Sequence, residues 1–171
     1  MHRESYEEMW QNLTRYCGEA LREPRAVVDV GSRDINGTYR GLMPGCWSYL
    51  GLDLGPGRNV DRVMPSAFDT GLADGYADIV LCGQVLEHCT DPPKLVREIA
   101  RILRPGGWCF LVAPAVWVRH RFPVDCWRIL RDGMRALIQG AGLECLTGYE
   151  RPLGRHGWVD CWGVGRKPKQ K

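Results

Sequence analysis

The stretch VVDVGSRDING, residues 27–37, decides the fold, because a short apolar run breaks there into a polar turn that contains glycine. In open α/β sheets, a buried strand that ends in such a turn presents backbone N–H groups to a ligand. Asp53 closes a second apolar run about 20 residues further on, where a ribose-binding carboxylate is expected. Together the two features predict a nucleotide-like cofactor, and therefore an enzyme.

Size and composition are those of an ordinary globular protein: 171 residues, 44% hydrophobic and 25% charged. We expect one domain over residues 1–171, with an N-terminal helical segment (1–23), a core (24–166) and a frayed tail (167–171). No apolar run approaches the roughly 20 residues of a membrane-spanning helix, and the acidic N-terminus does not resemble a secretory signal. A cytoplasmic protein without a membrane partner is therefore expected.

Cysteine spacing and charge add two expectations. None of the eight cysteines forms a C-x-x-C pair, so we expect reduced, buried thiols rather than disulfides or zinc ligands. Residues 1–100 hold 10 Lys and Arg against 15 Asp and Glu, whereas residues 101–171 hold 13 against 5. The first part then suits a cationic ligand and the second an anionic substrate or surface, unless the basic face is only solvated.

Hydrophobic periodicity predicts alternating strands and helices. The expected helices cover residues 4–22, 92–103 and about 132–140, and the expected strands cover 26–30, 47–52, 60–64, 77–82, 108–113, 143–149 and 157–165. The link between the second and third strands is too short for a normal crossover helix, so that helix is missing or the third strand is a stub. The last two strands should pair antiparallel, which completes a three-layer α/β sandwich with a mostly parallel sheet and a C-terminal antiparallel hairpin.

Three blocks carry a resemblance to a known family: VVDVGS (27–32), LGLDL (50–54) and ADIVLCGQVLEHCTDPPKLVREIARILRPGGWCFLVAP (77–114). In this order they resemble the class I S-adenosylmethionine-dependent methyltransferases, particularly the group called methyltransferase type 11. The resemblance covers roughly residues 24–165. It implies a Rossmann-like fold, S-adenosyl-L-methionine as cofactor, and methyl transfer.

The resemblance also implies which residues hold the cofactor. Gly31 lets the backbone approach it, and Ser32 and Arg33 offer N–H groups to its amino-acid end. Asp29 either attracts the ammonium group or orients the loop, and Asp53 accepts both ribose hydroxyls. The complete expected set is Asp29, Gly31, Ser32, Arg33, Asp53, Leu54, Ser66, Ala67, Phe68, Cys82, Gly83, Gln84 and His88.

The chain departs from the family pattern at two points. The second and third glycines of G-x-G-x-G are replaced by Arg33 and Ile35, so Asn36-Gly37 is expected to make the tight turn. Pro65 stands where a polar contact to adenine is usual, so apolar packing and backbone groups are expected to hold the adenine.

Chemistry is expected in PAVWVRHRFPVDCWR, residues 114–128, which resembles an H-x-x-P-x-D-[YC]-W-R loop of some type 11 relatives. His120 is the first candidate for a general base, since its reference pKa lies near neutrality. Asp125 is the second, as a base or as the group that orients His120. The structural alternatives are an exposed loop histidine and an Asp125–Arg128 ion pair. Trp117 and Trp127 are expected to form apolar walls, and Arg119, Arg121 and Arg128 to neutralise an anionic acceptor.

Gln84, Glu87, His88 and His120 also resemble the metal cluster of small-RNA 2′-O-methyltransferases. That cluster begins with a glutamate, and the neutral Gln84 replaces it poorly as a ligand for a hard cation, so no metal is expected. The favoured function is S-adenosylmethionine-dependent methyl transfer to oxygen or nitrogen of a small or medium-sized, and conceivably anionic, acceptor. An RNA methyltransferase and a degenerate cofactor-binding module without catalysis are the alternatives. The oligomeric state is left open.

Overall fold

The computed structural model describes residues 3–154 and 157–169. Within them, seven strands form one sheet in the order β3-β2-β1-β4-β5-β7-β6. The strands are β1 (Ala26–Val30), β2 (Ser48–Asp53), β3 (Arg62–Val63), β4 (Ala77–Gly83), β5 (Leu103–Val116), β6 (Glu144–Leu153) and β7 (Trp158–Arg166). The helices are α1 (Arg3–Cys17), α2 (Pro92–Ile102) and α3 (Arg131–Gly140), with 3₁₀ turns η1 (Gly18–Arg22), η2 (Arg40–Leu42) and η3 (Leu86–His88).

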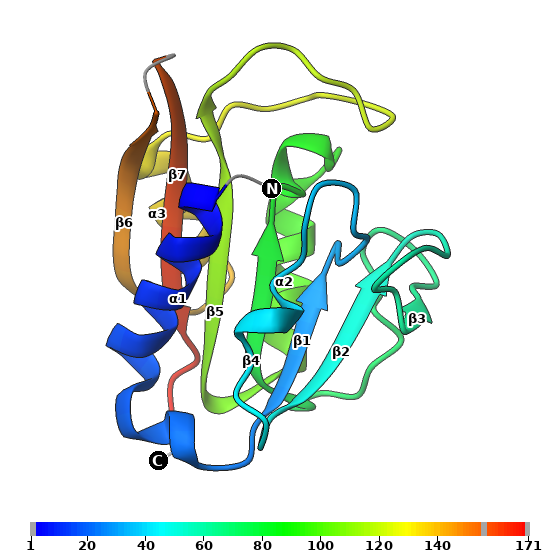
Figure 1. Ribbon diagram of the computed structural model, residues 1–171, viewed down its shortest axis with the longest axis vertical. Coiled ribbons are helices and arrows are strands. Elements are labelled where there is room, and N and C mark those ends of the chain that lie inside the picture. Colours follow the sequence, from blue (N-terminus) through cyan, green and yellow to red (C-terminus); the bar gives the residue numbers. More distant parts are fainter. Residues whose placement is uncertain (1–2, 155–156, 170–171) are drawn as a thin grey trace.

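The sheet is the middle layer of a sandwich (Figure 1), with α1 and η2 on one face and α2 and α3 on the other. Successive residues of the buried strands point to opposite faces of the sheet and pack into two separate cores. Ile79 and Leu81 pack in the core on the α1 side, whereas Val80 and Cys82 pack in the core on the α2 and α3 side. All strand pairs are parallel except those of β7, which runs antiparallel to β5 and β6. The predicted mixed α/β sandwich is therefore confirmed.

In the part of the chain that the structure describes, the sheet's β3 edge has no crossover helix between β2 and β3, as the short spacing predicts, and none between β1 and β2. Between β1 and β2 the chain makes only the 3₁₀ turn η2, and the buried Tyr39 packs against Gly83 in the space beside it. β3 is a two-residue stub that pairs Leu52 with Arg62 and Asp53 with Val63. This edge of the molecule is therefore built from loops.

Several boundaries differ from the sequence prediction: α1 ends at Cys17, where the 3₁₀ turn η1 follows, and β6 continues to Leu153. β5 begins at Leu103, five residues early, because Leu103 already pairs with Ala77 before a bulge. The tail prediction is wrong at Lys167: its N–H donates to Gly107 O, and its Nζ donates to Ala100 O and Leu103 O at 2.8 and 2.7 Å. Carbonyls at the end of α2 lack hydrogen-bond partners within the helix, so Lys167 satisfies them and fixes the start of the tail against α2. Residues 170–171 of the predicted tail lie outside the described residues.

Several smaller expectations can also be compared with the structure. Asp91 caps α2, its side chain accepting the Lys94 N–H at 3.0 Å as predicted. All eight cysteines are free, but Cys46 and Cys126 are exposed, so the prediction of buried thiols fails for these two. Among the described residues, no helix combines the length and apolarity that crossing a membrane requires.

Glu98 of α2 holds the loop between β3 and β4. Its buried carboxylate accepts hydrogen bonds from the Thr70 backbone N–H and hydroxyl at 2.8 and 2.6 Å, and from Arg101 at 2.7 Å. Burial by itself raises the pKa of Glu98, but the hydrogen bonds from Arg101 and Thr70 outweigh it and leave the pKa below its ordinary 4.5. Arg101 also pairs with the exposed Asp74.

We predict that Glu98→Gln lowers the free energy of unfolding by about 1.5–3 kcal/mol at pH 7. Because the folded-state pKa of Glu98 is lowered, its carboxylate stabilises the fold above pH 4.5, and this contribution is lost as the pH falls below that value. Urea unfolding at pH 7 and pH 3.5 measures both effects. Asp74→Asn removes the exposed partner of the same arginine and should change stability by less than about 0.5 kcal/mol. Equal losses in the two variants would contradict this account of Glu98.

Candidate active site

The loop after β1 is locked against the end of β2. Gly31 has φ +81°, and a Cβ there would lie 2.1 Å from Val85 Cγ2, so this position requires glycine. The N–H groups of Gly31 and Ser32 both donate to Leu52 O at 2.8 Å. The expectation that Ser32 offers its N–H to a cofactor is therefore wrong, because that donor is already used within the fold.

Asp53 ends β2 and faces this loop. Its carboxylate accepts the Arg33 N–H at 3.2 Å and the Gly55 N–H at 3.4 Å. Each carboxylate oxygen has a second lone pair, so Asp53 keeps acceptors for a ligand diol while it orients the loop. The backbone N–H of Arg33, like that of Ser32, is already bonded within the protein.

Asp29 lies inside the fold, 3% exposed, and accepts a hydrogen bond from the Tyr49 hydroxyl. Burial raises its pKa to about 7, against the opposing effect of the Tyr49 hydrogen bond. Of the two roles expected from the sequence, the geometry favours the internal one, in which Asp29 supports the loop. The expected tight turn is present at Gly37, which has φ +126° and donates its N–H to Asp34 Oδ1.

At the end of β4, the side chains of Cys82 and Gln84 are buried or bonded within the fold. Cys82 is fully buried in the core, and a Cβ on Gly83 would lie 2.7 Å from the Tyr39 ring. Gln84 has φ +58°, donates its N–H to Val112 O, and donates from Nε2 to Asp160 Oδ1 at 3.0 Å. Among the predicted cofactor-binding residues, Cys82 is therefore unable to reach a ligand with its side chain.

Sequence reasoning missed the partner of Gln84. Asp160 of β7 is 1% exposed and also accepts the Ser5 hydroxyl at 2.6 Å, so it joins α1, β4 and β7. A charged residue within the apolar run WVDCWGVG was the available signal. The N-terminal helix is thus bonded to the site edge.

The segment expected near adenine follows β3, the neighbour of β2. Ser66 forms a small bridge with Asp69, and Lys94 Nζ lies 4.8 Å from the centre of the partly buried Phe68 ring. Leu54, just after Asp53, is 59% exposed. Because β2 and β3 are parallel, with Asp53 opposite Val63, Leu54 and residues 66–68 leave the sheet at the same edge.

The loop at residues 117–130, above the strand ends in Figure 1, is fastened to the turn η3. The Cys126 N–H donates to Glu87 O at 2.7 Å, and Trp127 Nε1 donates to Cys89 O at 2.8 Å. His88 Nδ1 lies 2.6 Å from Val124 O. Two segments that follow neighbouring strands β4 and β5 are thereby joined into one surface.

Asp125 is not placed to act as a base. Arg128 pairs with both its oxygens at 2.6 and 2.9 Å, and Oδ2 also accepts the His120 N–H at 2.7 Å. The Arg128 guanidinium holds the pKa of Asp125 well below its usual range. Asp125 therefore positions the backbone of His120, and Arg128 is not free for an acceptor.

The remaining aromatic and basic residues of the loop differ in their surroundings. Trp117 packs against Trp158 of β7 with ring centres 4.1 Å apart and ring planes inclined at 47°, whereas Trp127 is 46% exposed. Arg119 and Arg121 are exposed and border a hollow of about 420 Å³ with residues 123–126. A second hollow, of about 950 Å³, lies away from Asp53, between Pro92–Pro93, residues 127–133 and Tyr149–Glu150.

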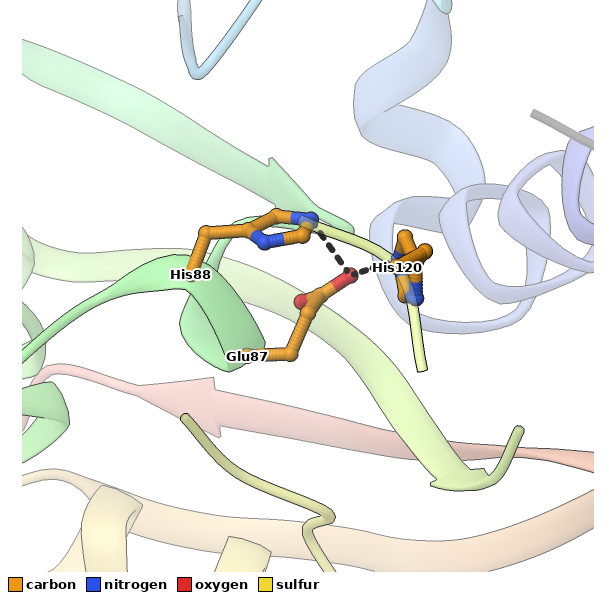
Figure 2. A group of neighbouring side chains, drawn as sticks. All are labelled: Glu87, His88 and His120. Carbon is orange, nitrogen blue, oxygen red and sulfur yellow. Dashed lines mark ion pairs between the residues drawn. The ribbon is translucent and has the colours of Figure 1, made fainter. Parts of the chain in front are cut away.

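Glu87, His88 and His120 converge at the junction of η3 and the loop (Figure 2). Glu87 Oε1 lies 3.6 Å from His88 Nε2 and 3.8 Å from His120 Nε2. Glu87 is fully buried, which raises its pKa to about 8, and burial lowers the pKa of His88. Perturbed acid–base groups at a sheet edge where ligands bind make this cluster the candidate for the chemistry of the site.

The sheet order, with its antiparallel β7 inserted between β5 and β6, matches the Rossmann-like fold of solved methyltransferases. A family model described as "Methyltransferase domain" matches residues 42–111. Together with the fold, this match to less than half of the chain supports a class I methyltransferase.

Individual relatives agree with this assignment. The chain is similar to a ubiquinone biosynthesis O-methyltransferase of Thiobacillus denitrificans (44% identity over 55 residues; 32% of this chain and 24% of that protein). It is also similar to an uncharacterized methyltransferase of Mycobacterium sp. strain KMS (32% over 124 residues; 65% of this chain and 45% of that protein). The chain spans less than half the length of either relative.

Among solved structures, the fold matches that of 1,6-didemethyltoxoflavin-N1-methyltransferase from Burkholderia thailandensis, determined with 1,6-didemethyltoxoflavin and S-adenosylhomocysteine bound. The TM-score is 0.75 at 14% identity, and the match covers 96% of this chain and 78% of that one. At this identity the likeness concerns the fold.

We predict that Asp125→Asn lowers the free energy of unfolding by about 1.5–3 kcal/mol, because a charged acceptor is lost from both Arg128 and the His120 N–H. Affinity for S-adenosylhomocysteine should stay within about twofold, since Asp125 does not face the Gly31 loop. Urea unfolding and calorimetry provide the two measurements. Asp132→Asn, at an exposed acid of α3, is the control and should leave both unchanged. Lost cofactor affinity at unchanged stability would show that Asp125 has been misplaced.

Proposed function

We propose that this chain transfers a methyl group from S-adenosyl-L-methionine to oxygen or nitrogen of a small or medium-sized acceptor. The observation that carries the proposal is the Asp53 carboxylate, which closes β2 beside the locked Gly31 loop and keeps lone pairs for a ribose diol. The chemistry of this acceptor fits the cofactor. The Glu87–His88–His120 cluster follows β4 and β5, at the same edge of the sheet.

A hydroxyl acceptor has the most support. The O-methyltransferase named above acts in ubiquinone biosynthesis, as its name states, and aligns over about a third of this chain. Arg119 and Arg121 supply exposed positive charge beside the cluster, which suits an acceptor with an anionic group. The net positive charge of residues 101–171 points the same way.

In this proposal the cofactor supplies an electrophilic methyl group, and the protein positions the acceptor and removes its proton. Orientation alone accounts for much of the acceleration of such a displacement. His120 Nδ1 lies 3.2 Å from Val118 O, so in the neutral imidazole the proton is on Nδ1 and Nε2 can accept one from the acceptor. The Asp125–Arg128 pair fixes the backbone that carries this imidazole.

Asp53→Ala should weaken S-adenosylhomocysteine binding by about 1.5–3 kcal/mol, because the ribose loses a charged acceptor. Isothermal titration calorimetry measures this effect. Glu144→Ala, at an exposed acid of β6, serves as the control and should bind as tightly as the wild type. Unchanged affinity in Asp53→Ala would show that Asp53 does not bind the ribose.

His120→Gln should lower kcat for methyl release by roughly 10²–10⁴-fold while cofactor affinity stays within about twofold, since the variant loses only the base. The assay follows methyl release over a panel of phenols, carboxylates and amines, with Arg119→Gln as the loop control that changes KM for anionic acceptors only. Cofactor binding without transfer to any acceptor would indicate a degenerate module. Transfer to RNA that weakens steeply with salt would indicate an RNA methyltransferase.

A further inference from the structure

The Glu87 carboxylate is the least satisfied polar group of the site. Its side chain is fully buried, and neither Oε1 nor Oε2 has a hydrogen-bond partner. Buried carboxylates are normally paired or bound to a metal, since removing such a group from water is costly. The nearest side-chain nitrogens, on His88 and His120, lie at 3.6 and 3.8 Å, too far for hydrogen bonds.

In its neutral form, each imidazole presents a lone pair rather than a proton to this carboxylate. His88 Nδ1 lies 2.6 Å from Val124 O, and His120 Nδ1 lies 3.2 Å from Val118 O. A carbonyl oxygen only accepts, so each Nδ1 carries the proton and each Nε2 is left as an acceptor. When Glu87 is ionised, three acceptors therefore converge without a donor among them, and backbone carbonyls set the ring orientations as they do for metal-ligating histidines.

The spacing of these acceptors suits a single cation. The three ligand-type atoms lie within 4.8 Å of one another. Around a tetrahedral ion with bonds of about 2.0–2.2 Å, ligand atoms are roughly 3.3–3.6 Å apart, so small side-chain rotations would bring all three into contact. Figure 2 shows the carboxylate between the two rings, which come from η3 and from the loop after β5.

We propose that Glu87, His88 and His120 bind one divalent first-row transition-metal ion, for which Zn²⁺ is the best match. Two imidazoles and one carboxylate form a ligand set of catalytic zinc sites, which keep a further position open. Imidazole ligands favour such ions over Mg²⁺ and Ca²⁺, which prefer oxygen. His88 and His120 are partly exposed, so water or an acceptor can reach the open position.

The raised pKa of Glu87 agrees with this geometry, because a buried carboxylate without a cation holds a proton instead. Gln84 is not a ligand here, since its side chain is bonded to Asp160. The proposed metal binding does not require that the chain transfer methyl groups. Where the proposed transfer also holds, an ion on His120 Nε2 excludes that atom as the base, so the metal dependence of transfer distinguishes the two roles.

Titration of the chelator-treated full chain with Zn²⁺ and with Co²⁺ tests the proposal, by calorimetry and by the visible absorption of bound Co²⁺. We expect one ion per chain, with affinity falling about 100-fold in Glu87→Gln and in His120→Ala. Glu87→Gln should melt no lower than the wild type without metal, because it replaces a buried carboxyl group that has no hydrogen-bond partner with a neutral amide of similar size. Zn²⁺ should then raise the Tm of the wild type and leave that of Glu87→Gln unchanged.

Cys126→Ser is the matched control, since this exposed thiol lies in the same loop and is a common site of adventitious zinc binding. It should bind Zn²⁺ as tightly as the wild type. The proposal is overturned if Zn²⁺ does not bind, if Glu87→Gln and His120→Ala bind it unchanged, or if Cys126→Ser abolishes binding. S-adenosylhomocysteine affinity measured in chelator tests the proposed function separately, so the two can fail independently.

Discussion

The site depends on the seam between the turn after β4 and the loop after β5. The Glu87 carbonyl accepts the Cys126 N–H, and the Val124 carbonyl holds the His88 ring, so each segment fixes the other. Without these bonds, His120 would belong to a solvent-exposed loop and Glu87 would lie at an open turn. The seam also accounts for the burial of Glu87, because the loop covers it.

A second constraint links this seam to the rest of the sheet. Asp160 of β7 binds both Gln84 and Ser5, so the N-terminal helix, the central strand β4 and the antiparallel hairpin meet beside the cluster. The Gly31 loop is tied to β2 through Leu52 in the same way. The proposed cofactor side and acceptor side are therefore both held by strand ends, which would give the reacting groups fixed relative positions.

Patterns of local sequence predicted most of the fold, because apolar runs such as residues 77–82 and the Asp91 cap act over short distances. Long-range partners were not predictable. The Lys167 side chain binds the end of α2, and Asp160 binds Gln84, which lies 76 residues away in the sequence. Neither contact produces a periodic pattern in the sequence. Residue types alone also could not decide whether the Ser32 N–H was free, since its acceptor belongs to another strand.

A crystal structure of the chain with S-adenosylhomocysteine tests the central claim most directly. The account predicts both ribose hydroxyls within about 2.6–3.2 Å of the Asp53 carboxylate, with the sulfur facing the Glu87–His88–His120 cluster. A ligand bound elsewhere, or a ribose that Asp53 does not touch, would contradict it.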